Sequence, residues 1–157
     1  MNTLSVDAFL ADSAESVQGK IYAMGIGWNS IYAPSLPIIQ SRIAMGLIIH
    51  IPYTATNINH KVVVHLEDAD GQRMSLRPGG EQNVDVKTIT ELAAPFNLGR
   101  PPLLPAGDSQ VLAIAMTFEQ VFLESQGMFN WVITIDGQEM KRIPMRVYQL
   151  NQPGQIS

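Results

Sequence analysis

The chain has 157 residues, the size of a single domain, of which 46% are hydrophobic and only 15% are charged. It contains no cysteine, which excludes disulfide bonds and thiolate metal sites. Ten basic and fourteen acidic residues give a net charge of −4 without a cluster of basic residues, so nucleic-acid binding, which requires a basic surface, is disfavoured.

Hydrophobic and polar residues alternate in several segments, the pattern of strands with one buried face. In chain order these segments cover residues 4–10, 43–51, 62–66, 112–118, 129–135 and 143–147. No stretch keeps a helical hydrophobic pattern over a useful length. We therefore predict an all-β fold of the antiparallel sandwich type with about seven to nine strands, in one domain that covers residues 1–150. Residues 151–157 are expected to be a frayed tail.

The acidic turn at Asp68–Gly71 separates two residues that both belong in the core, Leu66 and Met74. Two residues on the same face of a hairpin require a loop of odd length. A three-residue loop of residues 69–71, with Gly71 in the left-handed conformation, meets this requirement.

A second hairpin signal, Asp136-Gly137, links the strands that carry Trp131 and Met145. Both of these residues are odd-numbered, so the hairpin needs an odd loop or a β-bulge. Trp131 is expected to be buried against the opposite sheet, between Phe129 and Ile133 on its own strand.

Glycine and proline interrupt the pattern between residues 78 and 107, most strongly at Gly99–Gly107. Because proline cannot donate to a ladder, Gly99–Gly107 is predicted to be a loop or a strand edge. The run Pro101–Pro105 is interpreted as a stiff connection that its two leucines, Leu103 and Leu104, anchor across the sandwich. A polyproline ligand for a partner is the alternative.

Several pieces of the chain match one known pattern together: Leu10–Glu15, Gly19–Tyr22, Gly25–Trp28, the Asp68–Gly71 turn, Gly99–Gly107, and Gly127–Trp131 followed by Ile135–Gly137. In these pieces, which span most of its length, the chain resembles a small, uncharacterised family of bacterial and phage proteins, known only as a domain of unknown function. The resemblance implies an immunoglobulin-like or C2-like β-sandwich. It brings no activity, ligand or catalytic residue.

The three histidines are interpreted as surface residues. His60 and His65 are five positions apart on one predicted strand, so their side chains point to opposite faces and cannot bind the same metal ion. His50 lies on the polar face of another strand. We expect no metal site.

Other candidate sites also fit ordinary turn chemistry better. The acidic turn lacks the ligand spacing of a calcium loop, and Gly25-Ile26-Gly27 precedes no helix, as a phosphate-binding loop would require. No nucleophile motif is present. We therefore expect no enzyme activity and no cofactor.

Two segments are hydrophobic on both faces, which is unusual for a strand with one face in water. Residues 21–28 have large apolar side chains on one side, and the strand at residues 43–51 has small or apolar residues opposite its core row. If the two strands are neighbours in one sheet, their outer faces form a flat apolar patch. A partner covers this patch in the favoured interpretation, and residues 78–107 cover it in the other. The candidate interface consists of Tyr22, Met24, Ile26, Trp28, Ala44, Gly46 and Ile48.

These observations favour a non-catalytic protein–protein interaction or assembly module, such as a phage or phage-like structural component. Its expected partner is another copy of the chain, in a homo-oligomer, or another assembly component. The alternative is a small-molecule-binding protein with a pocket formed by sandwich loops.

A cytoplasmic or virion location is expected, without secretion or membrane binding. The N-terminus has acidic residues where a signal peptide would be basic. The longest apolar run, Ile43–Ile51, is far shorter than the ~20 residues that a membrane-spanning helix needs.

Overall fold

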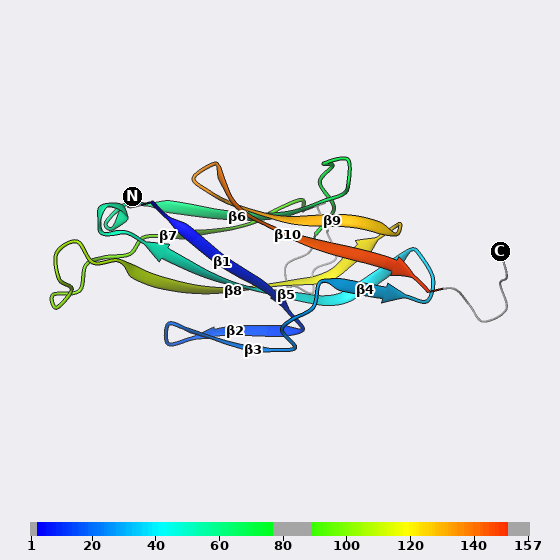
Figure 1. Cartoon of the computed structure of the whole chain (residues 1–157), viewed down its shortest axis with the longest axis horizontal. Helices are drawn as coiled ribbons and strands as arrows, with labels where there is room; N and C mark the ends of the chain where they lie inside the picture. The colour runs from blue at the N-terminus through cyan, green and yellow to red at the C-terminus, as the bar shows by residue number, and fades with distance from the viewer. Residues whose placement is uncertain (1–2, 77–88, 151–157) are drawn as a thin grey trace.

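The computed structural model describes residues 3–76 and 89–150, which form ten strands in three sheets (Figure 1). Within these ranges the only helix is a single 3-10 turn, η1, at Tyr53–Ala55, so no described helix is long enough to cross a membrane. The predicted all-β class is confirmed. The strands are β1 Ser5–Ala11, β2 Ser13–Val17, β3 Lys20–Met24, β4 Ser30–Ala33, β5 Ile38–Ile51, β6 His60–Glu67, β7 Leu92–Phe96, β8 Gln110–Leu123, β9 Gly127–Ile135 and β10 Gln138–Gln149.

The described strands outnumber the seven to nine that the sequence predicted. The strands that the alternation pattern missed, β2, β4 and β7, are four or five residues long. None of them carries a row of large apolar residues, and β7 contains Pro95. Strands this short leave too few alternating positions to be recognised.

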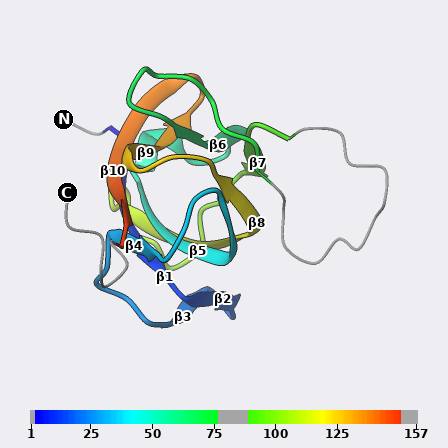
Figure 2. The ribbon, with the colours of Figure 1, turned by 90° about the vertical axis from the view of Figure 1, so that its right-hand side faces the viewer.

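Two sheets face each other across the hydrophobic core (Figure 2). One has the order β1-β5-β8 and the other has the order β4-β10-β9-β6-β7. All pairs in them are antiparallel except β4 with β10, which run parallel. The third sheet is the β2–β3 hairpin, which contacts β5 and β8 on the side away from the core (Figure 1).

Trp131 on β9 lies at the centre of the core and is fully buried. Its ring packs at a tilt against Phe118 of β8, in the opposite sheet, with the ring centroids 4.7 Å apart. The indole N–H points at the sulfur of Met145, 3.5 Å away. Phe129 and Ile133 on the same strand are also buried, so the predicted position of Trp131 is confirmed.

The loop after β6 has the predicted three residues. The N–H of Asp68 donates to the carbonyl of Gln72, and the N–H of Met74 donates to that of Leu66, which leaves residues 69–71 as the loop. Gly71 has φ +79°, the left-handed conformation that the loop requires.

The β9–β10 hairpin has a two-residue turn, Asp136-Gly137, with both residues at positive φ. The register then shifts between Glu139 and Lys141. This shift is the predicted bulge, and it lets Trp131 and Met145 both face the core although the turn has an even number of residues.

Part of the Pro78–Gly107 segment and the predicted tail at 151–157 lie outside the described residues. Gly99–Gly107 is a loop, as predicted, but the interpretation that both leucines anchor it is wrong. Two tight turns close with hydrogen bonds from Leu104 N–H to Pro101 O and from Asp108 N–H to Pro105 O. They turn Leu103 outward, where it is 94% exposed.

We expect Trp131→Ala to lower the free energy of unfolding by about 3–5 kcal/mol, because it removes a fully buried indole from the contact between the two sheets. Denaturant titration measures this loss. A loss below about 1 kcal/mol would contradict the central position of Trp131 in the core.

Candidate functional site

The β2–β3 hairpin turns at Gln18-Gly19, where φ is +50° and +75°. Two consecutive residues with positive φ form the type I′ turn that suits the twist of two-residue hairpins. The sequence analysis missed this hairpin because Gln18 is not one of the residues, Asn, Asp or Gly, that usually begin such a turn. The signal that could have found it is Gly19 between two short runs, the first of which has small residues, Ala14 and Ser16, at every second position.

One face of the hairpin is turned toward the three-stranded sheet. Ala14 is paired with Ala23, and Ser16 with Ile21, so these four side chains share one face. The Ser16 hydroxyl donates to the carbonyl oxygen of Ala113 in β8, at 3.2 Å. The hydrogen bond identifies this face as the one that docks on the sheet.

The sheet surface beneath the hairpin consists of small residues. Ala44 on β5 is paired with Ala11 on one side and with Thr117 on the other, and Gly46 is paired with Ala115. The ring of Phe9 lies over Gly46, where any side chain would overlap it. Small side chains such as Ala14, Ala23, Ala44 and Ala115 allow the hairpin to approach the sheet closely. Ala44 and Gly46 are both buried within the single chain, Gly46 under the ring of Phe9.

The structure therefore separates the two halves of the candidate interface. The two segments belong to different sheets, and the chain's own hairpin, a cover that neither alternative anticipated, lies over β5. On β5, Ala44 and Gly46 are buried and Ile48 is half-buried. Trp28, beyond the hairpin, is half-buried and packs against the core.

The remaining three candidates lie together at the hairpin and are exposed. Tyr22, Met24 and Ile26 expose 60%, 73% and 55% of their surface, and Val17 near the turn is also exposed. Val17, Tyr22 and Met24 are on the face of the hairpin opposite Ala14 and Ile21, and Ile26 follows β3. We call these four residues the hairpin surface.

The base of the hairpin is held by a close backbone contact. The N–H of Asp12 donates to the carbonyl of Met24 at 3.0 Å. Gly25 has φ +72°, and a side chain there would overlap the carboxylate of Asp12. Glycine is therefore required at position 25 both by the backbone conformation and by the available space.

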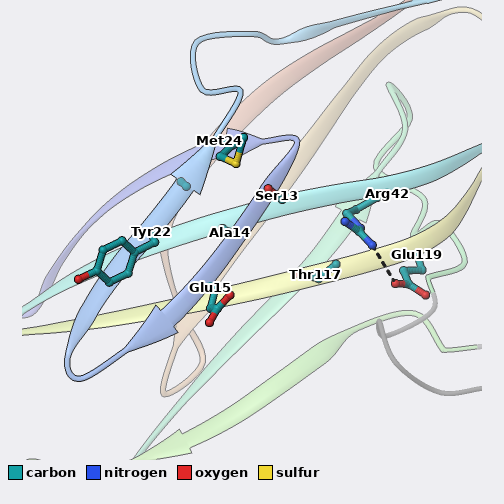
Figure 3. A pocket seen from close by; sticks show the side chains of 9 residues that line it. Ser13, Ala14, Glu15, Tyr22, Met24, Arg42, Thr117 and Glu119 are labelled. Atoms are coloured by element: carbon teal, nitrogen blue, oxygen red, sulfur yellow. Dashed lines mark ion pairs between the residues drawn. The ribbon is translucent and has the colours of Figure 1, made fainter.

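A groove of about 660 Å³ lies beside the hairpin (Figure 3). Its charged residues are Glu15 from the hairpin and the ion pair of Arg42 with Glu119, whose closest atoms are 3.9 Å apart. Both members of this pair are exposed, so it contributes little stability. The groove is lined by Ser13, Ala14, Glu15, Tyr22, Ala23, Met24, Arg42, Thr117 and Glu119.

The interpretation of the histidines as surface residues is wrong for two of them, because His60 and His65 are buried. They do lie on opposite faces of β6, as their spacing predicted. His50 is partly exposed, 2.9 Å from the Asp7 carboxylate. Buried polar side chains need partners, and in this chain carboxylates provide them for the histidines.

His60 connects three segments. Its Nδ1 is 2.6 Å from Oδ2 of Asp136 in the β9–β10 turn, and its Nε2 is 2.8 Å from the carbonyl oxygen of Ala55 in η1. The ring also stacks on Phe96 of β7. Both oxygens are acceptors only, so both ring nitrogens must donate, which requires a protonated His60.

The electrostatics of this contact agree with a charged His60. Burial by itself lowers the pKa of His60, but the hydrogen bonds to Asp136 and Ala55 outweigh it, and the net pKa is raised. The hydrogen bond from His60 lowers the pKa of Asp136 against the opposing effect of desolvation. With neither nitrogen free, His60 holds the three segments together and has no lone pair with which to act as a base.

A second polar network crosses the outer face of the five-stranded sheet. Nε2 of His65 is 2.7 Å from Glu67, and Arg142 of β10 donates to Glu67 at 3.0 Å. Arg142 is paired with Val132 of β9, so its side chain must pass over β9 to reach β6. The hydrogen bond from His65 lowers the pKa of Glu67, and Arg142 adds to this effect against desolvation.

The acidic turn is held by its own backbone. Oδ1 of Asp68 accepts hydrogen bonds from the N–H groups of Asp70 and Gln72, both at 2.9 Å. This carboxylate therefore has a structural role in the turn. Across residues 3–76 and 89–150, no group of three or more His, Asp or Glu side chains is placed to hold a metal ion.

We expect the stability of the fold to fall as the pH rises from about 6.5, because His60 has a raised pKa in the folded state. Its contribution to the free energy of unfolding is complete below the unfolded-state pKa of about 6.5, and it is lost as the pH rises through the higher folded-state pKa. The lowered pKa of Asp136 gives a contribution that is lost as the pH falls below about 4. Denaturant titrations between about pH 2.5 and pH 8 would measure both trends, with the maximum at about pH 4–6.5.

Asp136→Asn is expected to flatten this profile and to lower the free energy of unfolding at pH 6 by about 1 kcal/mol, since Asp136 is half-exposed and the bond is partly screened. Asp70→Asn is the control, because it removes the same charge from an exposed turn position. If both variants kept the wild-type pH profile, the proposed protonation of His60 would be refuted.

The comparisons with known proteins assign the chain to a family but give it no activity. No curated protein matches it. The model of a family of unknown function, DUF6941, matches residues 6–148, which include the hairpin and both facing sheets. The resemblance to an uncharacterised family is confirmed at this level. Because the match covers most of its length, the chain belongs to the family of unknown function DUF6941.

Proposed function

We propose that the protein is a non-catalytic protein–protein interaction or assembly module that binds a partner through the hairpin surface and forms a homo-oligomer. The observation that carries this proposal is the exposure of Val17, Tyr22, Met24 and Ile26 on one small element. The opposite face of that element is already used to dock on the three-stranded sheet. A cluster of large apolar side chains in water is the usual mark of an interface.

The chemistry of the hairpin surface supports a protein as the partner. Aromatic residues and methionine are enriched at the centres of protein interfaces, and Tyr22 and Met24 are neighbours on β3 with that character. The hairpin itself has only two strands, and such an element is marginally stable by itself. Contact with a partner would stabilise it and remove the apolar side chains from water.

The use of the titratable groups supports a non-catalytic role. Both nitrogens of His60 are bound, and the described groove contains no histidine. The two facing sheets around one core support a β-sandwich of the immunoglobulin-like or C2-like type. An assembly role fits a bacterial or phage protein, such as a phage or phage-like structural component in the cytoplasm or the virion.

We expect the wild-type chain to elute above its 17.3 kDa monomer mass in light scattering coupled to size exclusion, at tens of micromolar protein. Tyr22→Asp is expected to shift the protein to the monomer, because a buried, unpaired charge costs an interface several kcal/mol. Leu103→Asp is the matched control, since Leu103 is exposed in a distant loop. A monomeric wild type, or an oligomer that Tyr22→Asp leaves intact, would disprove the proposal.

Small-molecule binding is the second candidate, favoured by the groove in Figure 3. Its volume of about 660 Å³ lies within the usual range for ligand pockets. The groove lies between strands instead of the expected sandwich loops. Arg42 with Glu15 and Glu119 would suit a small ligand with both charges.

If this second function holds, a charged metabolite will raise the melting temperature of the wild type, and Arg42→Ala will abolish the shift. Arg73→Ala is the control, because Arg73 forms a similarly exposed ion pair with Glu91 at a distance from the groove. An absence of shifts across a metabolite panel, or equal shifts in both variants, would count against ligand binding.

A further inference from the structure

We propose that the partner is a second copy of the chain, and that the two copies join their β3 strands edge to edge, antiparallel about a two-fold axis at Tyr22. The hairpins would then form one sheet with the order β2-β3-β3-β2. This inference rests on the proposed function, because it names the partner and the edge of β3, the strand that carries Tyr22 and Met24 of the hairpin surface, as the place of pairing. It follows from the free edge of β3, its hydrogen-bonding groups and its charge pattern.

The edge of β3 is open in the part of the chain that the structure describes, where β2 is its only sheet neighbour. In Figure 1, β3 is seen on the side of β2 away from the two facing sheets. Outside the hairpin, β2 contacts both β5 and β8, whereas β3 contacts mainly β8. A second copy can therefore approach β3 from outside without first displacing β2.

The backbone groups that point to this edge can be identified. The carbonyl of Met24 accepts from Asp12, so the backbone groups of Met24 face β2. In an antiparallel strand, successive residues point their N–H and C=O groups to alternate sides. The groups of Ile21 and Ala23 therefore point to the open edge.

Pairing about Tyr22 uses all of these groups. Ile21 of each copy lies opposite Ala23 of the other, and their N–H and C=O groups bond reciprocally. Tyr22 lies opposite its own symmetry mate at a non-hydrogen-bonded position, where side chains come closest. Such a two-fold contact is self-complementary, as a closed dimer requires.

The charge pattern favours β3 over β2 for self-pairing. The only charged residue of β3 is Lys20, which lies opposite Met24 of the second copy in this register. β2 has Glu15 at its centre, so the equivalent pairing would place two carboxylates opposite each other. Like charges at directly opposed positions destabilise a sheet.

The edges of the two larger sheets carry features that discourage pairing. Asp7 lies within β1, Pro95 lies within β7, and β4 ends directly before Pro34. In β8, Gln120 has φ +54°, which interrupts the regular strand. β3 has no proline, no positive φ and no central charge.

Disulfide trapping tests the register directly, because the chain has no cysteine of its own. We expect Tyr22→Cys to form a disulfide-linked dimer under mild oxidation, since opposed non-hydrogen-bonded positions meet the distance needed for a disulfide. Tyr32→Cys is the matched control, because Tyr32 is 62% exposed and Tyr22 is 60% exposed. The cross-linked fraction at position 22 should exceed the control at least tenfold.

A mixing experiment checks the same register at the strand ends. Lys20→Cys chains alone and Met24→Cys chains alone should stay near the control level, because each introduced thiol lies far from its own symmetry mate. An equimolar mixture of the two variants should cross-link, because position 20 of one copy meets position 24 of the other. Non-reducing gel electrophoresis and intact mass measure each product.

The possible outcomes separate the two proposals. If Tyr22→Asp converts an oligomer to a monomer but Tyr22→Cys cross-links no better than Tyr32→Cys, the hairpin surface is an interface and the β3 pairing is wrong. If Lys20→Cys chains alone cross-link as well as the mixture, the two-fold axis is not at Tyr22 and the pairing is again wrong. A wild type that is monomeric, with no cross-linking at position 22, overturns both proposals.

Discussion

The small residues on the outer face of the three-stranded sheet determine which apolar side chains of this chain are buried and which are exposed. Ala44, Ala115 and Thr117 leave room for the hairpin to lie against β5 and β8, and the ring of Phe9 fills the space over Gly46. The hairpin can bury one face only, because its two strands alternate between the sheet and solvent. Tyr22 and Met24 consequently point outward. The hairpin therefore covers apolar surface of the sheet and exposes apolar side chains of its own.

The polar groups of the molecule hold the other end of the structure together. His60 joins η1, the start of β6 and the β9–β10 turn, and the network of His65, Glu67 and Arg142 spans the outer face of the five-stranded sheet. Both ring nitrogens of His60 are hydrogen-bonded, whereas the buried Nδ1 of His65 has no hydrogen-bond partner among the described residues. These contacts explain why two histidines can be buried in this fold, while large apolar side chains of the hairpin are exposed.

The alternating pattern predicted the core residues correctly, because it depends only on which side chains are removed from water. Trp131 is buried between its predicted neighbours, and both predicted turns have the expected length or bulge. The histidine interpretation was wrong for His60 and His65 because their partners, Asp136 and Ala55 in one case and Glu67 in the other, cannot be recognised by sequence spacing. A carboxylate that is distant in the chain can make a buried histidine stable.

The sequence by itself determined the all-β class, the inward rows of the long strands, the loop at residues 69–71 and the apolar character of residues 21–26, because these follow from local alternation and turn geometry. Only the tertiary structure decided which apolar faces are covered. Gly46 and Met24 both belonged to the expected patch, yet Gly46 is buried under Phe9 and Met24 is exposed. The difference arises because Phe9 of the neighbouring β1 covers Gly46, whereas Met24 lies on the outward face of the hairpin that docks on β5 and β8. The contact of the hairpin with β8 joins segments about 100 positions apart, which no local pattern specifies.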